Sequence, residues 1–230
     1  EELLRIPVEV DLASELRYRN PIINEYTLII VISQSGETAD TIAALKEAKS
    51  RGARVLSIVN VVGSTIAKMS DDVLYTWAGP EIAVATTKGY STQLALLYLF
   101  GVYAAELIGN ISKEQYTDMI AELQNLPEQI EKALVFNDNI KTLAQRYHKN
   151  QSVFFIGRNI DYAVSMEGSL KLKEISYIHS ESYPAGELKH GTISLIDNDR
   201  LVIALACYER LFDKMMSNIK EVKARGAKVL

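Results

Sequence analysis

The segment from Ser33 to Thr38 reads Ser-Gln-Ser-Gly-Glu-Thr and stands between an apolar run, 28–32, and a helical pattern, 39–51. In an open α/β sheet, ligands bind at such strand-to-helix turns. Three hydroxyl groups, a glycine that lets the backbone approach closely, and the unpaired N–H groups of a helix start form an anion cradle. A capping role would explain one hydroxyl group and leave the rest unused. The segment therefore predicts a phosphate-binding loop.

A second group of chemically competent residues comprises Glu167, Lys171 and Glu174, whose spacings of four and three residues stack them on one helix face. A solvated salt-bridge ladder is the commonest meaning of this spacing. The same helix carries apolar residues around much of its circumference, which makes an exposed ladder harder to place. Because a partly buried Glu beside a Lys is poised for proton transfer, the context favours a catalytic cluster.

His190 lies in a polar stretch, 180–191, whose proline and glycines indicate irregular backbone. Histidine is a natural acid or base near neutral pH, which favours a catalytic role over that of a turn residue bonded to backbone. His148 is predicted to lie on the surface, and His179 is predicted to be structural.

A third element, 81–93, joins an expected strand near 73–76 to the apolar helix after Ser91. Its hydroxyl groups and backbone could line the same pocket as the phosphate loop. They are equally good helix caps, so residue type alone leaves both alternatives open.

Apolar and β-branched runs alternate with helical patterns along the chain, which is the rhythm of a parallel α/β sheet. Further expected strands are 8–10, 28–32, 55–59, 153–156, 201–206 and 228–230, and expected helices are 38–50, 91–108, 162–176 and 211–224. The stretch 111–145 is charged and helix-forming, and Pro127 is expected to open a new helical segment within it.

The chain contains an internal repeat, because 46–56 matches 220–230 at most positions and 13–16 parallels 185–188 in the right order. Junctions of helix, glycine and strand resemble one another widely, but agreement over several elements favours a duplicated α/β unit. In the second copy the loop 206–211 has neither the hydroxyl cluster nor the glycine. Only the first copy is therefore expected to bind phosphate.

The repeat also predicts the domain organisation. The second copy opens with a strand and helix, 152–176, that have no counterpart in the first copy, so the first copy is expected to lack its opening part. The second copy stops at Leu230, whereas the first continues beyond the equivalent strand, so the second is expected to lack its C-terminal part. The expected boundaries are a first α/β domain at 1–110, a helical connector at 111–145 and a second α/β domain at 146–230.

Composition argues against several classes of function. A net charge of −4 provides no broad basic field for nucleic acid or an anionic membrane. The most apolar stretch, 94–105, is shorter than the roughly 20 residues of a membrane span. No signal-peptide pattern opens the chain and Cys207 is its single cysteine, which favours the cytoplasm. Three scattered histidines offer no metal-ligand spacing, so neither a metal nor a cofactor is expected.

The chain resembles the sugar isomerase domains of glutamine–fructose-6-phosphate aminotransferases, also called glucosamine-6-phosphate synthases. The resemblance covers essentially all 230 residues and is carried by 33–40, 81–88, 170–179 and 186–191. It implies an α/β fold of two flavodoxin-like SIS domains, each a parallel sheet between helical layers. It also implies that the substrate is a ketose phosphate and the product an aldose amino sugar phosphate, made for amino-sugar and cell-wall precursors.

The resemblance assigns the substrate contacts. The phosphate would be held by four residues of the first loop, Ser33, Gln34, Ser35 and Thr38. The sugar would be contacted by Val84 and Thr86, and Thr86 stands where serine is common in the family.

The resemblance also assigns the chemistry. His190 would open the sugar ring, and Glu174 would move the proton between C1 and C2 with support from Lys171 and Glu167. The family pattern implies that His190 serves the neighbouring subunit of a homodimer. The family's Schiff-base lysine is expected in a tail beyond Leu230, so this stretch alone is expected to be inactive. A glutaminase domain is expected in the full-length protein.

Two alternatives remain open. One is another enzyme on the same fold, such as a fructosamine-phosphate deglycase or a related ketose–aldose phosphate isomerase. The other is a phosphosugar-sensing module, which needs the phosphate loop but not the cluster at Glu174 and Lys171, and which often carries a helix-turn-helix DNA reader that this sequence does not show.

Overall fold

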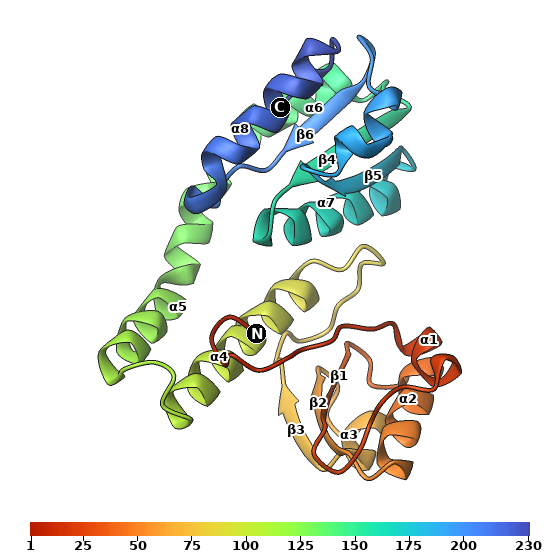
Figure 1. Ribbon diagram of the computed structural model, residues 1–230, viewed down its shortest axis with the longest axis vertical. Coiled ribbons are helices and arrows are strands. Elements are labelled where there is room, and N and C mark those ends of the chain that lie inside the picture. The colour runs from red at the N-terminus through yellow and green to blue at the C-terminus, as the bar shows by residue number, and fades with distance from the viewer. The chain divides into compact units, whose positions relative to one another are not determined.

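The computed structural model describes all 230 residues, which divide into two compact units, Glu1–Lys132 and Ala133–Leu230. Each unit contains one parallel sheet with helices packed against it (Figure 1). This confirms the predicted α/β fold. None of the helices combines the length and the apolar character needed to cross a bilayer.

The first unit carries a three-stranded sheet in the order β1-β2-β3, and both neighbouring pairs are parallel. Its strands are β1 (Leu28–Ser33), β2 (Arg54–Val59) and β3 (Asp72–Tyr75). Its helices are α1 (Ala13–Leu16), α2 (Ala39–Ser50), α3 (Thr65–Met69), α4 (Lys88–Leu107) and most of α5 (Lys113–Leu134).

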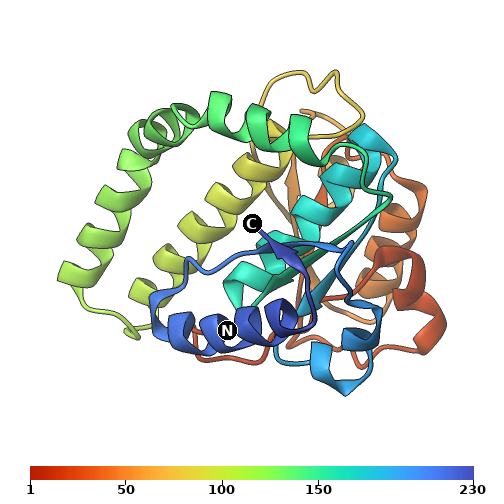
Figure 2. The same cartoon turned by 90° about the horizontal axis from the view of Figure 1, so that it is seen from above.

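The core of the first unit lies between the sheet and α2 with α3. Side chains alternate across a strand, so Val31 and Val55 point to the same layer as Leu45 of α2 and Ile66 of α3. Both views show α2 running beside β1 and β2 (Figures 1 and 2). This packing directs the ends of β1 and the start of α2 toward one edge of the sheet.

The second unit carries a four-stranded parallel sheet in the order β5-β4-β6-β7. Its strands are β4 (Ser152–Gly157), β5 (His179–Pro184), β6 (Leu201–Ala204) and β7 (Lys228–Val229). Its helices are α6 (Asn137–Tyr147), α7 (Ile160–Ser176) and α8 (Phe212–Ala224), and short 3₁₀ turns occupy Leu188–His190, Thr192–Leu195 and Glu209–Leu211.

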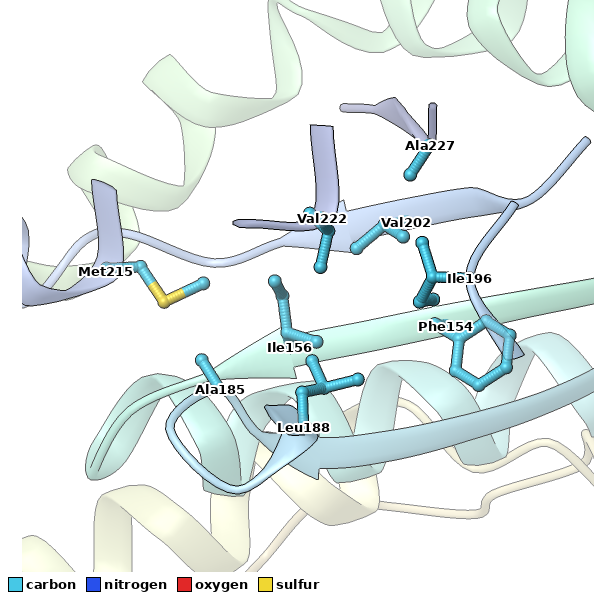
Figure 3. Packing of buried hydrophobic residues seen from close by; sticks show 9 residues of the cluster. All are labelled: Phe154, Ile156, Ala185, Leu188, Ile196, Val202, Met215, Val222 and Ala227. Atoms are coloured by element: carbon cyan, nitrogen blue, oxygen red, sulfur yellow. The ribbon is translucent and has the colours of Figure 1, made fainter. Parts of the chain in front are cut away.

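Helices cover both faces of this second sheet. On one face, Ile156 and Val202 pack against Met215 and Val222 of α8, as Figure 3 shows. On the other face, Phe155 belongs to a smaller cluster that includes residues of α6 and α7. The sheet therefore holds α7 firmly, which matters because α7 carries the predicted catalytic cluster.

The internal repeat is visible in the topology. The order β1, α2, β2 in the first unit matches β6, α8, β7 in the second, and each pair of strands is adjacent and parallel. The predicted domain boundaries stay a prediction, and the division between the two units falls within the expected connector 111–145.

Three predictions about elements were wrong. No strand forms at 8–10, where Val10 is 95% exposed. In the second unit, the corresponding strand β5 pairs with β4. The first unit has no strand that corresponds to β4, so the run 8–10 has no partner to pair with. Pro127 opens no new segment and lies inside α5, which runs unbroken to Leu134 before a separate α6. The polar stretch 180–191 was expected to be irregular, yet its first part is β5.

Candidate functional site

The hydroxyl groups of the predicted phosphate loop shape the turn between β1 and α2. Ser33 is 8% exposed, and its Oγ accepts the N–H of Gly36 at 3.1 Å and lies 3.4 Å from Oγ1 of Thr38. Oγ of Ser35 accepts the N–H of Glu37 at 3.2 Å. The side chain of Thr38, at the N-cap, makes no capping hydrogen bond to α2. The alternative that these hydroxyls only cap the helix is therefore not supported.

The same turn is fastened to the start of α3. Gly36 has a φ of +66°, and a Cβ at this position would overlap Oγ of Ser64. The carbonyl of Gly36 accepts the N–H of Ile66 at 3.0 Å, and Glu37 accepts the N–H of Thr65 at 2.7 Å. These contacts within the protein fix the backbone of the loop.

Gln34 is the residue of the loop with the clearest unmet bonding capacity. Both polar atoms of its side chain are buried and have no hydrogen-bond partner. A Cβ on Gly89 would lie 3.0 Å from its Oε1 and 2.9 Å from Oγ1 of Thr86, so the backbone of α4 approaches both side chains closely. Buried amides are normally satisfied, so an unpaired one beside Thr86 is a candidate ligand contact.

The loop that carries Thr86 is organised by a residue that the sequence analysis did not select. Oε2 of Glu81 accepts the hydroxyl of Thr86 at 3.0 Å, the N–H of Gly89 at 3.0 Å and the N–H of Thr87 at 3.3 Å. The N–H of Gly89 and the other donors hold the pKa of Glu81 below its usual value. Glu81 therefore caps the start of α4 and leaves the hydroxyl of Thr86 to act only as an acceptor.

Two further residues lie in the loops that follow the strands of the first unit, Asn60 after β2 and Val84 after β3. Val84 is 95% exposed, so its side chain makes no packing contribution. Asn60 ties two loops together, because its N–H donates to the carbonyl of Gln34 at 3.3 Å and its Oδ1 accepts the N–H of Ala78 at 2.8 Å. The sequence offered no spacing signal for Asn60, because its partners lie far along the chain.

In the second unit, α7 brings Glu167, Lys171 and Glu174 together as predicted from their spacing. Their side chains are 21%, 19% and 28% exposed, so the cluster is not a fully solvated ladder. Nζ of Lys171 lies 3.4 Å from Oε1 of Glu167 and also pairs with the carboxylate of Glu174. The carboxylate of Glu174, and then that of Glu167, raises the pKa of Lys171.

The three histidines lie in different settings. His190 is exposed at the end of a 3₁₀ turn, and its backbone N–H donates to the carbonyl of Glu187 at 3.0 Å. No hydrogen bond or ion pair joins it to the cluster on α7. His148 is exposed, as predicted. The prediction for His179 was wrong, because its side chain is 64% exposed at the first residue of β5, where its polar partners are Ser152 and Glu181.

The structure thus provides two sets of polar groups, one in each unit. In the first unit, Gln34 and the loop hydroxyls share one edge of the sheet with Thr86. In the second unit, two carboxylates share one ammonium on α7. No group of three or more His, Cys, Asp and Glu side chains is arranged to hold a metal ion. The individual roles of these residues stay predictions.

Comparison with known proteins identifies relatives over the whole chain. A glutamine–fructose-6-phosphate aminotransferase [isomerizing] from Clostridium tetani is 59% identical over all 230 residues, which correspond to 38% of that protein. A protein of the same name from Caldanaerobacter subterraneus is 60% identical over the same length. The chain therefore spans about two fifths of the length of these relatives.

The fold also matches that of a solved structure over nearly the whole chain. The C-terminal domain of glucosamine-fructose-6-phosphate aminotransferase from Francisella tularensis superposes with a TM-score of 0.97 at 39% identity, and the match covers 99% of this chain and 65% of that one. The family model described as "SIS domain" matches residues 1–103 and 146–230, which include the Ser33–Thr38 loop and the cluster on α7. The chain belongs to the SIS domain family.

Proposed function

We propose that this chain is the sugar isomerase part of an isomerising aminotransferase, which converts fructose 6-phosphate and ammonia from glutamine into glucosamine 6-phosphate. The identity of up to 60% to proteins named for that reaction, over every residue of the chain, carries the proposal. The product would supply hexosamine for amino-sugar and cell-wall precursors.

The first unit would hold the sugar phosphate. The free start of α2, the hydroxyls of Ser33, Ser35 and Thr38 and the unpaired amide of Gln34 provide donors for the phosphate. Thr86 would accept a hydrogen bond from a sugar hydroxyl, since its own proton is given to Glu81. The exposed backbone at Val84 would contact the sugar.

The second unit would carry out the proton transfers. Glu174 is the proposed base that moves a proton between C1 and C2. Lys171 would stabilise the Glu174 carboxylate, and Glu167 would support the transfer through its own ion pair with Lys171. His190, whose side chain is exposed, would open the sugar ring.

Assembly and location form part of the same proposal. The protein would act as a homodimer in which His190 serves the neighbouring subunit, and its full-length form would include a glutaminase domain. We infer a cytoplasmic location from the single exposed Cys207 and from the metabolic character of the relatives' reaction.

The proposal is tested in a chimera in which this chain replaces the matching 230 residues of the Clostridium tetani relative. Wild-type chimera is expected to convert fructose 6-phosphate to glucose 6-phosphate when glutamine is omitted. Glu174→Gln is expected to lose about 10²- to 10⁴-fold in kcat with substrate affinity preserved, because only proton transfer is removed. Glu131→Gln, an exposed carboxylate on α5, is the matched control.

The outcomes separate the alternatives. A wild-type chimera that binds the sugar phosphate without turnover contradicts the isomerase and favours a sensing module. Turnover that releases an amine from fructosamine 6-phosphate, without isomerisation, favours a deglycase. Equal kcat for wild type and Glu174→Gln contradicts the role of Glu174.

A further inference from the structure

The loop between β6 and α8 is the second-copy counterpart of the phosphate loop between β1 and α2. Both loops leave the carboxyl end of a parallel strand and lead into a helix that is followed by the sequence Arg-Gly-Ala before the next strand. The second loop, 206–211, lacks the hydroxyl cluster, so its backbone N–H groups need another partner.

That partner is Asp161, a residue of the first turn of α7. Asp161 is only 7% exposed, and its Oδ2 accepts the N–H of Cys207 at 2.8 Å and the N–H of Tyr208 at 3.0 Å. Two convergent backbone N–H groups are the donors with which such turns bind anions. In the second copy the anion is a carboxylate of the chain itself.

The first copy differs in this respect. The N–H groups of Gly36 and Glu37 donate to serine hydroxyls, and no carboxylate of the chain accepts from the turn or from the start of α2. The carboxylate of Glu37, which is nearest in sequence, is engaged with the N–H of Thr65. The first loop therefore stays open to an external anion, whereas Asp161 closes the second.

The start of α7 is held by more than this carboxylate. A Cβ on Gly157 would overlap the backbone of Asp161, so α7 begins directly against the end of β4. Asn159 has φ +53° and ψ −122°, a conformation that is unfavourable for a non-glycine residue and persists only where surrounding contacts enforce it. Nε of Arg158 donates to the buried Asn218 of α8 at 2.9 Å.

The remainder of α7 is linked to β5 by paired hydroxyl groups. Oγ of Ser165 lies 2.7 Å from Oγ of Ser182, and Oγ of Ser169 lies 2.9 Å from Oγ of Ser180. These bonds keep α7 against β5 but leave its first turn dependent on the junction described above. Glu167, Lys171 and Glu174 follow Asp161 by about two to four helical turns.

We propose that Asp161 is a positioning residue, whose carboxylate occupies the anion-binding turn of the second repeat and thereby fixes the helix that carries Glu167, Lys171 and Glu174. The proposal rests on the proposed isomerase function for its catalytic consequence. Its structural part, the replacement of a bound anion by a side chain, does not depend on that function.

The catalytic part is tested with Asp161→Ala and Asp161→Asn in the Clostridium tetani chimera. Both variants are expected to lose about 10- to 100-fold in kcat, because small displacements of a catalytic group have effects of this size. KM for fructose 6-phosphate is expected to stay unchanged, because the Ser33–Thr38 loop is untouched. Asp138→Ala, which removes an exposed aspartate from the first turn of α6, is the matched control and is expected to leave both constants unchanged.

The anion part is tested with formate, the smallest carboxylate, against chloride at equal ionic strength. Formate is expected to restore part of kcat in Asp161→Ala, to raise the Tm of the 230-residue Asp161→Ala chain, and to leave wild type and Asp161→Asn unaffected. General loss of packing would not be reversed by a small anion. The Tm measurement needs no catalytic activity.

Each result has a distinct meaning. If the wild-type chimera does not isomerise, the proposed function fails, and Asp161 is judged by the Tm measurement alone. If wild type turns over while Asp161→Ala keeps full kcat, or raises KM instead, the positioning role is overturned. If formate changes neither kcat nor Tm of Asp161→Ala, the anion-turn assignment is overturned.

Discussion

Hydroxyl groups in the first unit are committed to different bonding roles, and these roles limit what a ligand can find there. Thr86 gives its proton to Glu81, so only its lone pairs remain available. Ser35 accepts the N–H of Glu37 and keeps its own proton available for a phosphate oxygen. Residue type alone does not separate a hydroxyl that can donate from one that can only accept.

Ser35 provides the sharpest residue-scale prediction. Ser35→Ala is expected to weaken fructose 6-phosphate binding to this chain by about 10- to 100-fold, because a hydrogen bond to a charged group is worth about 1.5–3 kcal/mol. Isothermal titration calorimetry would measure the change. Ser50→Ala, at the far end of α2, is the control, since its hydroxyl bonds only to the carbonyl of Glu47. Equal affinity of wild type and Ser35→Ala would disprove the phosphate assignment.

At the scale of elements, carboxylates organise the starts of helices and the turns between them. Glu81 caps α4, Glu37 bonds to the start of α3, and Asp161 joins α7 to the turn before α8. None of these residues precedes its target in a capping spacing. Each acts through a loop that folds back, which explains why periodicity did not identify them.

The cap at α4 predicts a pH-dependent stability. Because the pKa of Glu81 is lowered on folding, its contribution is present above its unfolded pKa and is lost as pH falls through the lower folded value. Glu81→Gln is expected to have a lower Tm than wild type at pH 7, with the difference shrinking toward pH 3. A Tm difference that stays constant from pH 7 to pH 3 would contradict the ionised cap.

The predictable elements were those whose pattern is local. The loop at Ser33 and the spacing at Glu167 were readable, because hydroxyl clusters and helix periodicity act within a few residues. The edge strand β5 was missed because its serines are satisfied by α7, which no local pattern reveals. The run 8–10 looked like a strand, but a strand forms only beside a partner, and Pro127 is tolerated within an exposed helix.

For the whole molecule, the two units have separate cores, which predicts that damage to one is confined to it. Ile156→Ala is expected to cost about 2–5 kcal/mol, since this side chain is fully buried in the second unit. Hydrogen exchange should accelerate at amides of β4 and β6 and stay unchanged at β1 and β2. Equal acceleration in β2 would show that both units unfold as one.

Asp161 also determines what a probe on this chain would report. Cys207 is the only cysteine and is exposed, while its backbone N–H is held by that buried carboxylate. A thiol-reactive fluorophore or spin label would attach at a single position, on the turn that holds the start of α7. Its mobility would record the docking of that turn in solution, so the chain can be followed spectroscopically with its own sequence unaltered.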